Sequence, residues 1–320
     1  MKITFLGTSA AEEYPGIWCD CEHCARARAL GGRNIRRNSS IFIDDDAMID
    51  MGKTAHIQAE RFGLNMRSVE TLIVTHSHSD HFDRHMLWAR QMTPSYDSLP
   101  DDEKRMVASP RFTALPRLTI IGSQQVSAAL AAEIDYTQPA AGIDFIVAEP
   151  YRAYKLSHRR QMPEGGATPG APHHPLRPEG GYGGDELCVF TLTGNHDDNG
   201  APSVNYVVTR HGRTFAYLTD TGWPIDSTLD ALKLYKYDFI ITEGTFGLGM
   251  DAEGHMRLDK NIRLLRFFNE NGLWKNKPDY YLTHIAPHWA PPHDEYAPIV
   301  EAHGLKLAYD GLVLDYPYNI

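Results

Sequence analysis

The sequence predicts an α/β fold in which sheet layers are covered by helices. Short apolar runs rich in Ile, Val, Leu and Phe, typical of buried strands, alternate with segments of helical periodicity. Many of the expected strands follow one another closely before the later helices begin, which favours stacked sheets over a simple doubly wound sheet. The chain has 320 residues, of which 42% are hydrophobic, enough to bury a sizeable core. That length could hold two ordinary domains or one large one, and we expect residues 1–320 to form a single domain.

Each expected element rests on a local pattern. The expected strands are short apolar runs, and they cover 2–6, 40–43, 47–50, 71–75, 118–122, 143–148, 187–193, 204–209, 214–219, 238–242, 279–283 and 306–314, the last with a turn at Asp310-Gly311. The expected helices are 53–63, 84–92, 123–134, 227–235, 257–271 and 293–303. Residues 94–116 and 158–184 lack apolar periodicity, so we expect irregular insertions there. Each insertion could be a lid over a site or a solvated surface loop.

Charge and hydropathy limit the classes of function. A formal net charge of −10 argues against a general nucleic-acid binder, so we expect no large nucleic acid as a partner. A small phosphorylated substrate remains compatible, because a metal site can supply local positive charge. No stretch approaches the ~18 apolar residues that would span a membrane, and no signal-peptide pattern precedes the first expected strand. We therefore expect a cytoplasmic protein with no membrane partner.

The most specific motif follows the expected strand 71–75. It is His76-Ser-His-Ser-Asp-His81, which places three imidazoles and a carboxylate within six residues. Alternate positions at a strand end project together, so His76 and His78 can bind one ion, and the turn that follows can present Asp80 and His81 to a second. Such nitrogen and oxygen ligands suit borderline-soft divalent metals. Two ions roughly 3.5–4 Å apart can activate a bridging water and hold a scissile group. A surface histidine cluster is the weaker alternative.

This motif resembles the HxHxDH signature of the metallo-β-lactamase superfamily. The resemblance implies an αββα sandwich of two mixed sheets flanked by helices, with the site at one edge between the sheets. It extends over nearly the whole chain, because His196, Asp220 and His284 follow expected strands in the order of the family's later ligands. The resemblance implies that one ion binds to three histidines, which are His76, His78 and His196. It implies that the other ion binds to Asp80, His81 and His284, and that Asp220 bridges both ions.

Asp50 matches the first conserved-motif aspartate of that superfamily, in Met48-Ile-Asp-Met-Gly52. The resemblance implies that it orients metal ligands through hydrogen bonds. A turn-forming aspartate before glycine is the alternative.

Three of the four cysteines, Cys19, Cys21 and Cys24, lie within six residues. Disulfides between positions so close would be strained, and clustered thiols in a cytosolic protein more often hold a metal. CxCxxC just after the first expected strand resembles the PhnP-like phosphodiesterases and also PqqB-like proteins. In the PhnP group these thiolates hold a structural zinc with a histidine that follows the last active-site histidine.

The resemblance makes His288 the candidate for the fourth ligand of this zinc. The segment His284-Ile-Ala-Pro-His288 contains one residue more than the His-x-x-His pattern of that group, which leaves His293 as a substitute and His23 as a further alternative. Three thiolates and an imidazole would make a closed, tetrahedral and therefore structural site.

A second likeness is to RNase Z. Glu243, in Ile241-Thr-Glu-Gly-Thr245, stands where that family has a His-Glu-Ala-Thr motif, with Thr242 in place of its first histidine. His255 lies just before an expected helix, where the family places a catalytic histidine. The resemblance implies that Glu243 orients His255, which contacts the phosphate or protonates the leaving oxygen. A surface histidine at a helix start is the alternative.

Together these motifs predict a metal-dependent hydrolase with two divalent active-site ions, zinc or manganese with iron also compatible, and one structural zinc. We expect a phosphodiesterase for a small phosphodiester, linear or cyclic, attacked by a water activated between the ions. We expect His255, Glu243 and Asp80 to take part in catalysis. A hydrolase for carbonyl esters, lactones or thioesters and a PqqB-like metal-binding protein are the alternatives. Dimers are common in the families that the chain resembles, so a homodimer is compatible.

Overall fold

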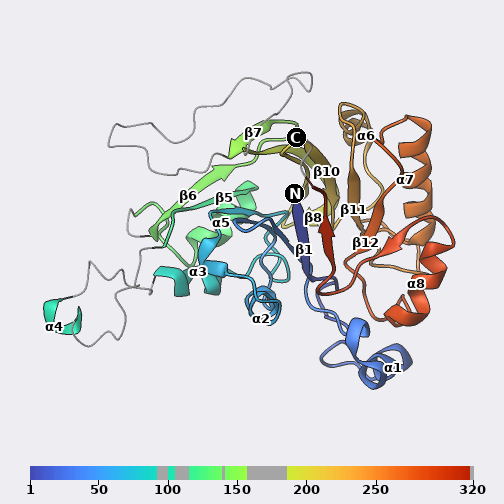
Figure 1. Cartoon of the computed structure of the whole chain (residues 1–320), viewed down its shortest axis with the longest axis horizontal. Coiled ribbons are helices and arrows are strands. Elements are labelled where there is room, and N and C mark those ends of the chain that lie inside the picture. The colour runs from blue at the N-terminus through green and yellow to red at the C-terminus, as the bar shows by residue number, and fades with distance from the viewer. Residues whose placement is uncertain (92–99, 105–114, 139–140, 157–185, 318–320) are drawn as a thin grey trace.

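The computed structural model describes residues 1–91, 100–104, 115–138, 141–156 and 186–317, and their strands form two seven-stranded sheets stacked face to face (Figure 1). The first sheet has the spatial order β14 (Val313–Asp315), β1 (Lys2–Gly7), β2 (Ser40–Ile43), β3 (Ala47–Ile49), β4 (Thr71–Ile73), β5 (Leu118–Gly122) and β6 (Ile143–Val147). The second has the order β13 (Lys306–Leu307), β12 (Tyr280–Thr283), β11 (Phe239–Glu243), β10 (Arg213–Leu218), β9 (Ala201–Arg210), β8 (Leu187–Asp198) and β7 (Ala153–Leu156).

Both sheets are mixed. In the first sheet, pairing is antiparallel from β14 to β3 and parallel from β3 to β6. In the second sheet, pairing is parallel from β13 to β10 and antiparallel from β10 to β7. The parallel strands of each sheet end at a common edge, and the loops that follow them meet there.

Helices cover the outer face of each sheet (Figure 1). The α-helices of the described residues are α1 (Glu22–Leu30), α2 (Ala55–Arg61), α3 (Arg84–Gln91), α4 (Asp101–Lys104), α5 (Gln124–Ala131), α6 (Asp226–Leu232), α7 (Leu258–Glu270) and α8 (His293–Glu301), of which α1 and α4 lie away from the outer faces of the sheets. Side chains of α2, α3 and α5 share a buried apolar cluster with the first sheet, and side chains of α6, α7 and α8 share another with the second. The predicted αββα architecture is therefore confirmed.

The alternation of side chains along the strands explains why both faces of each sheet are apolar. Ile41 and Ile43 belong to the core between the two sheets, whereas Phe42 packs under the helices of the first sheet. In the second sheet Ile241 faces the inter-sheet core, and Ile240 faces the helices. Successive strand residues point to opposite faces, so the continuous apolar runs of the sequence are those of strands buried on both sides.

Three local features differ from the sequence-based expectations. The helix α1 was not expected, because only two of its residues, Cys24 and Ala27, are buried and no apolar stripe marks it. The short strand β7 was also missed. The run 306–314 is not one strand with a turn: β13 pairs in the second sheet and β14 in the first, so the turn at Asp310-Gly311 lies where the chain passes between sheets.

The insertion expected at 158–184 lies outside the described residues, as does most of the one at 94–116, whose described part contains α4. Among the described residues, no helix combines the length and the apolarity needed to cross a membrane.

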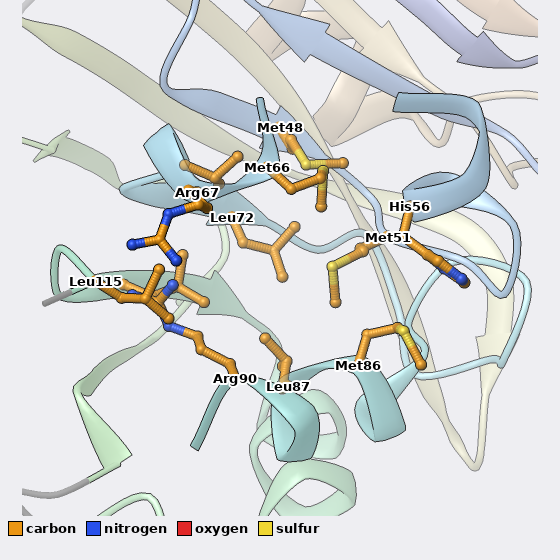
Figure 2. Close-up of a pocket in the computed structure, with 12 residues that line it drawn as sticks. Met48, Met51, His56, Met66, Arg67, Leu72, Met86, Leu87, Arg90 and Leu115 are labelled. Carbon is orange, nitrogen blue, oxygen red and sulfur yellow. The ribbon is translucent and has the colours of Figure 1, made fainter. Parts of the chain in front are cut away.

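An apolar cavity of about 220 Å³ lies on the outer side of the first sheet (Figure 2). Its lining is rich in methionine and contains two arginines, and it consists of Met48, Met51, His56, Met66, Arg67, Val69, Leu72, Met86, Leu87, Arg90, Leu115 and Leu118. None of the predicted metal ligands lines it, so it is separate from the site described next.

Candidate metal centre

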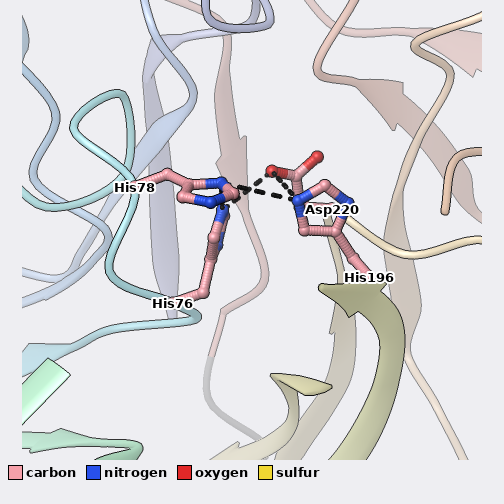
Figure 3. Close-up of side chains that lie close together, drawn as sticks. All are labelled: His76, His78, His196 and Asp220. Atoms are coloured by element: carbon pink, nitrogen blue, oxygen red, sulfur yellow. Dashed lines mark hydrogen bonds and ion pairs between the residues drawn. The ribbon is translucent and has the colours of Figure 1, made fainter. Parts of the chain in front are cut away.

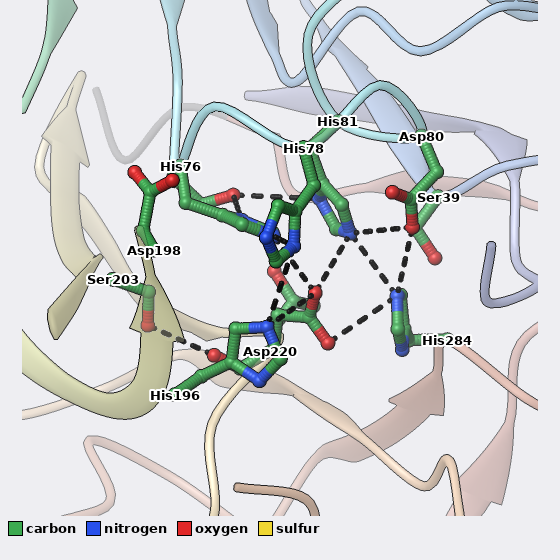
Figure 4. Close-up of polar contacts among 12 residues, drawn as sticks. Ser39, His76, His78, Asp80, His81, His196, Asp198, Ser203, Asp220 and His284 are labelled. Atoms are coloured by element: carbon green, nitrogen blue, oxygen red, sulfur yellow. Dashed lines mark hydrogen bonds and ion pairs between the residues drawn. The ribbon is translucent and has the colours of Figure 1, made fainter. Parts of the chain in front are cut away.

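Seven side chains that the sequence singles out as ligands meet at the shared edge of the two sheets (Figure 4). All of them lie at or just beyond strand ends: His76, His78, Asp80 and His81 after β4, His196 in β8, Asp220 after β10 and His284 after β12. The carboxyl ends of parallel strands leave backbone and side chains free to converge on a ligand. Segments far apart in the sequence thus reach one small volume.

The first group consists of His76, His78, His196 and Asp220 (Figure 3). His76 Nε2 lies 2.9 Å from His78 Nδ1 and 3.0 Å from Asp220 Oδ2. His196 Nε2 lies 3.5 Å from His78 Nδ1 and 3.7 Å from Asp220 Oδ2. Ligand atoms of a tetrahedral zinc with Zn–N bonds of ~2.0–2.1 Å lie about 3.3 Å apart. The spacing of this group therefore fits a single divalent ion.

The second group consists of Asp80, His81, Asp220 and His284. His81 Nε2 lies 3.0 Å from His284 Nε2, 3.3 Å from Asp80 Oδ2 and 3.3 Å from Asp220 Oδ2. His284 Nε2 lies 3.7 Å from Asp80 Oδ2 and 3.5 Å from Asp220 Oδ1. The same spacing criterion is met, and Asp220 belongs to both groups, the position of a carboxylate that bridges two ions.

The buried carboxylates at this centre require positive charge. Asp80 and Asp220 are 5% and 3% exposed, and their ion pairs among the described residues are with imidazoles, not with lysine or arginine. Asp220 Oδ1 is buried without a geometrically acceptable hydrogen-bond partner in that part of the chain. Burial opposes ionisation, but the neighbouring histidines His81 and His284 hold the pKa of Asp80 well below its usual range. Buried anions with few donors are the chemistry expected of a cation site.

Two imidazoles of the first group, those of His76 and His196, favour the neutral form that binds metal. Burial lowers the pKa of His76 and of His196. In the second group burial also acts against the charged form, but Asp80 and Asp50 raise the pKa of His81 well above its ordinary value. Two buried carboxylates stabilise the protonated imidazole of His81 in this way. A divalent cation bound between the same groups would supply the positive charge in place of that proton.

Four histidines are oriented so that Nε2 points into the centre. Each uses Nδ1 to donate a hydrogen bond to the protein: His81 to Asp50 Oδ2 at 2.7 Å, His284 to Thr245 Oγ1 at 2.8 Å, His76 to Thr75 Oγ1 at 3.1 Å and His196 to the Gly254 carbonyl at 3.3 Å. Such contacts fix the tautomer and leave Nε2 unprotonated for a metal. Sequence reasoning identified Asp50 but missed Thr245 and Gly254, whose roles depend on contacts between distant segments.

Backbone strain is concentrated at this edge. Asp50, Asp220 and His284 have φ values of 61°, 49° and 55°, in the left-handed region that non-glycine residues seldom adopt. Gly52 allows the HxHxDH loop to lie against the end of β3, because a Cβ there would come within 1.9 Å of the Asp80 carbonyl oxygen. Local conformations that cost energy persist where the surrounding contacts enforce them, and they cluster at functional sites.

His255 stands beside this centre and is held by Glu243. Its Nδ1 lies 3.0 Å from Glu243 Oε1 and 3.2 Å from Asp220 Oδ1. Glu243 is fully buried, and it also accepts hydrogen bonds from the backbone N–H groups of Thr221 and Thr245, both at 3.0 Å. Burial works against the imidazolium, but the Glu243 carboxylate raises the pKa of His255 to about 9. No described residue forms a hydrogen bond with His255 Nε2, so this nitrogen can meet a substrate.

The three clustered cysteines also converge. The sulfur atoms of Cys19, Cys21 and Cys24 lie within 4.8 Å of one another. His288 Nδ1 lies 3.8 Å from Cys19 Sγ, close to the ~3.6 Å expected for sulfur and nitrogen ligands of one tetrahedral zinc. His293 lies elsewhere: its Nδ1 accepts a hydrogen bond from the buried Arg36 guanidinium at 2.9 Å. His23 Nδ1 donates to the Pro287 carbonyl at 2.8 Å. Of the three histidines, His288 contacts a cysteine sulfur, although it does not lie within 4.8 Å of all three, so its role as the fourth ligand stays a prediction.

Comparison with known proteins identifies the fold. No protein-family model and no curated protein sequence matches the chain. A diphosphatase of the PhnP family is 20% identical, with a TM-score of 0.62 over 98% of this chain and 96% of its own. Human tRNase Z, short form, is 17% identical, with a TM-score of 0.58 over 99% and 100%. YhfI from Bacillus subtilis, a metallo-β-lactamase-fold protein, is 16% identical, with a TM-score of 0.58 over 98% of each chain. These similarities extend over nearly the whole of this chain, whose two mixed sheets are flanked by helices. The chain therefore has the metallo-β-lactamase fold.

Proposed function

We propose that this protein is a metal-dependent phosphodiesterase that uses two divalent ions to cleave a small phosphodiester. The observation that carries the proposal is the His255–Glu243 pair beside the shared carboxylate Asp220. A phosphodiester has a poor leaving group, and a positioned imidazolium can protonate the departing oxygen. Hydrolysis of a carbonyl ester or lactone at this metal centre would not need the His255–Glu243 pair.

The side chains of the centre fit two ions. His76, His78 and His196 would hold one, Asp80, His81 and His284 the other, and Asp220 both. Zinc, manganese and iron all accept such ligands. When bound, two such ions supply a nucleophilic oxygen at neutral pH and neutralise charge on the phosphoryl group.

The remaining chemistry belongs to His255 and its partner. With Nδ1–H held by Glu243, His255 in its protonated form presents Nε2–H towards the substrate. That proton passes to the leaving alkoxide oxygen as the P–O bond breaks, which leaves a neutral imidazole hydrogen-bonded to a carboxylate. A pKa raised to about 9 by the Glu243 carboxylate keeps His255 protonated before the reaction, as a general acid must be.

The cysteine cluster would hold a structural zinc with Cys19, Cys21, Cys24 and His288 as ligands. Three sulfurs and one nitrogen leave no open position for a substrate. The similarity to a diphosphatase and to a tRNase supports a phosphate-containing substrate for the other centre.

Hydrolysis of two diesters tests the proposal: bis(p-nitrophenyl) phosphate, whose leaving group needs little protonation, and glycerophosphocholine, whose leaving group is an alkyl alcohol. We expect turnover that depends on added manganese or zinc and is abolished by a chelator. Replacement of a general acid typically costs ~10²–10⁴-fold in rate. The His255→Ala variant should lose much more activity on the alkyl diester than on the nitrophenyl diester. The matched control is His303→Ala, at an exposed position just after α8, and it should lose no activity on either diester.

The opposite outcomes point to the alternatives. Equal losses on both diesters would remove the acid role of His255. Metal-dependent cleavage of lactones or thioesters without diester hydrolysis would favour a carbonyl hydrolase. Retention of zinc only at the cysteine cluster, with no hydrolysis of any kind, would favour a metal-binding protein.

A further inference from the structure

Two aromatic side chains continue outward from His255. Phe246 stands edge-to-face against His255, with ring centroids 5.2 Å apart and planes at 81°. Trp289 stands edge-to-face against Phe246, at 6.2 Å and 88°. Both side chains are partly exposed. An aromatic surface therefore begins at the imidazole that faces the leaving group in the proposed reaction. We call Phe246 and Trp289 the aromatic wall.

Backbone hydrogen bonds hold the two residues of the aromatic wall in place. Leu248 N donates to the Trp289 carbonyl at 2.8 Å, and Phe246 N donates to the Met256 carbonyl at 3.1 Å. Gly247 and Gly249 permit this close approach. A Cβ on Gly247, whose φ is 42°, would lie 2.4 Å from the Trp289 carbonyl oxygen, and a Cβ on Gly249 would lie 2.3 Å from the indole ring. The loop is thus shaped to hold Trp289 in one place.

The wall is bordered by further apolar surface. Leu248 and Met250, in the same loop, are 45% and 46% exposed. Exposed large apolar side chains in the loop that carries Phe246 are suited to bind an apolar ligand, because their exposure is otherwise unfavourable and a bound ring would cover it. Aromatic rings also give a flat partner a specific geometry beyond simple burial.

We propose that the aromatic wall selects phosphodiesters whose leaving group carries a flat apolar ring. The inference rests on the proposed function, since it places the leaving group beside His255. A ring attached to the departing oxygen would lie along Phe246 and Trp289 while the phosphoryl group lies at the metal ligands. A substrate with a short alkyl leaving group would make none of these contacts.

Binding of non-hydrolysable phosphonates to the metal-loaded protein, measured by calorimetry, tests the proposal without turnover. Benzylphosphonate, cyclohexylmethylphosphonate and ethylphosphonate, each used as its monomethyl ester, share the singly charged head group of a diester and differ in the ring. We expect benzylphosphonate to bind roughly tenfold more tightly than ethylphosphonate, with the cyclohexyl compound between them. Phe246→Leu and Trp289→Leu should each reduce that preference several-fold and leave ethylphosphonate affinity nearly unchanged. Trp88→Leu, at a 51% exposed position on α3, is the matched control and should change neither affinity.

Equal affinities of the three phosphonates for the unmodified protein, or no binding of any of them, would overturn the inference. A preference that survives in both wall variants would overturn it as well. Failure of this inference can be distinguished from failure of the proposed function. A preference for ring-bearing phosphonates without diester hydrolysis would refute only the phosphodiesterase activity. Diester hydrolysis without that preference would refute only the role of the aromatic wall. Thermal unfolding of each variant verifies that it is folded.

Discussion

Replacing Asp50 with asparagine should weaken metal binding by changing the tautomer of one histidine. The Asp50 carboxylate is fully buried and accepts hydrogen bonds from Thr75 N at 2.8 Å, from Thr75 Oγ1 at 3.0 Å and from His81 Nδ1 at 2.7 Å. An asparagine at this position has one oxygen to accept and an NH₂ group to place. With its oxygen kept on Thr75 N, the NH₂ group faces His81.

A donor facing His81 Nδ1 favours the tautomer that carries its proton on Nε2. Nε2 is the atom that lies 3.0 Å from His284 Nε2 in the second ligand group, and a protonated nitrogen cannot bind a metal. Loss of such an orienting carboxylate typically costs ~10–100-fold in metal affinity, or about 1.4–2.8 kcal/mol. The backbone should not add to this cost, because Asn tolerates the left-handed conformation that Asp50 adopts at φ 61°.

The assay is a zinc titration of metal-free protein against a competing chelator. We expect Asp50→Asn to weaken one of the two active-site ions by that factor, with diester hydrolysis falling in parallel. Asp238→Asn is the matched control. Asp238 is also buried, but it pairs with Arg213 at 2.8 Å and Lys275 at 2.7 Å, so its replacement should lower thermal stability and leave zinc affinity intact. Unchanged zinc affinity in Asp50→Asn would refute the tautomer argument.

Three further outcomes follow from the structure. Burial and the Arg36 guanidinium lower the pKa of His293 from 6.5 to about 3, so the unfolded chain binds the extra proton between those values and stability rises with pH there. The pH dependence of urea unfolding should therefore be shallower in His293→Asn, and an identical slope would contradict this. Leu72→Ala and Leu264→Ala should both destabilise within ~2–5 kcal/mol, with Leu72→Ala the milder because Leu72 already lines a cavity and has fewer contacts to lose. Equal losses in denaturant titrations would argue that the cavity is filled. Cys24→Ser should lower the zinc content by one ion per chain without affecting the other ions, and elemental analysis that shows no difference would argue against the structural zinc.

The sequence was most informative where structure is local. The HxHxDH segment places four predicted ligands within six residues, and the strand before it is a recognisable apolar run, so both the layered fold and the convergence at strand ends could be predicted. The fold prediction is confirmed. Which ion each residue binds stays a prediction, although the ligand atoms form two groups that share Asp220.

Features built from distant segments could not be predicted. Cys19 and His288 are 269 positions apart in the sequence. The extra residue Pro287 also departs from the His-x-x-His pattern, so spacing alone left the fourth ligand open. Thr245 was visible only as part of a motif, and its hydrogen bond to His284 depends on β11 and β12 being neighbours. The helix α1 follows directly after Cys21 with almost no apolar face, so periodicity had nothing to detect.

The loop after β12 joins three features that the sequence presents separately. It begins with His284 in the second ligand group, continues to His288 beside Cys19, and ends with Trp289 in the aromatic wall. His284 is anchored at Thr245 and Trp289 at the glycine loop, and a zinc on His288 would hold the residue next to Trp289. Because the glycine loop already holds Trp289 in one place, Cys24→Ser should leave the preference for benzylphosphonate over ethylphosphonate unchanged in calorimetry. A lost preference would show instead that the zinc positions Trp289.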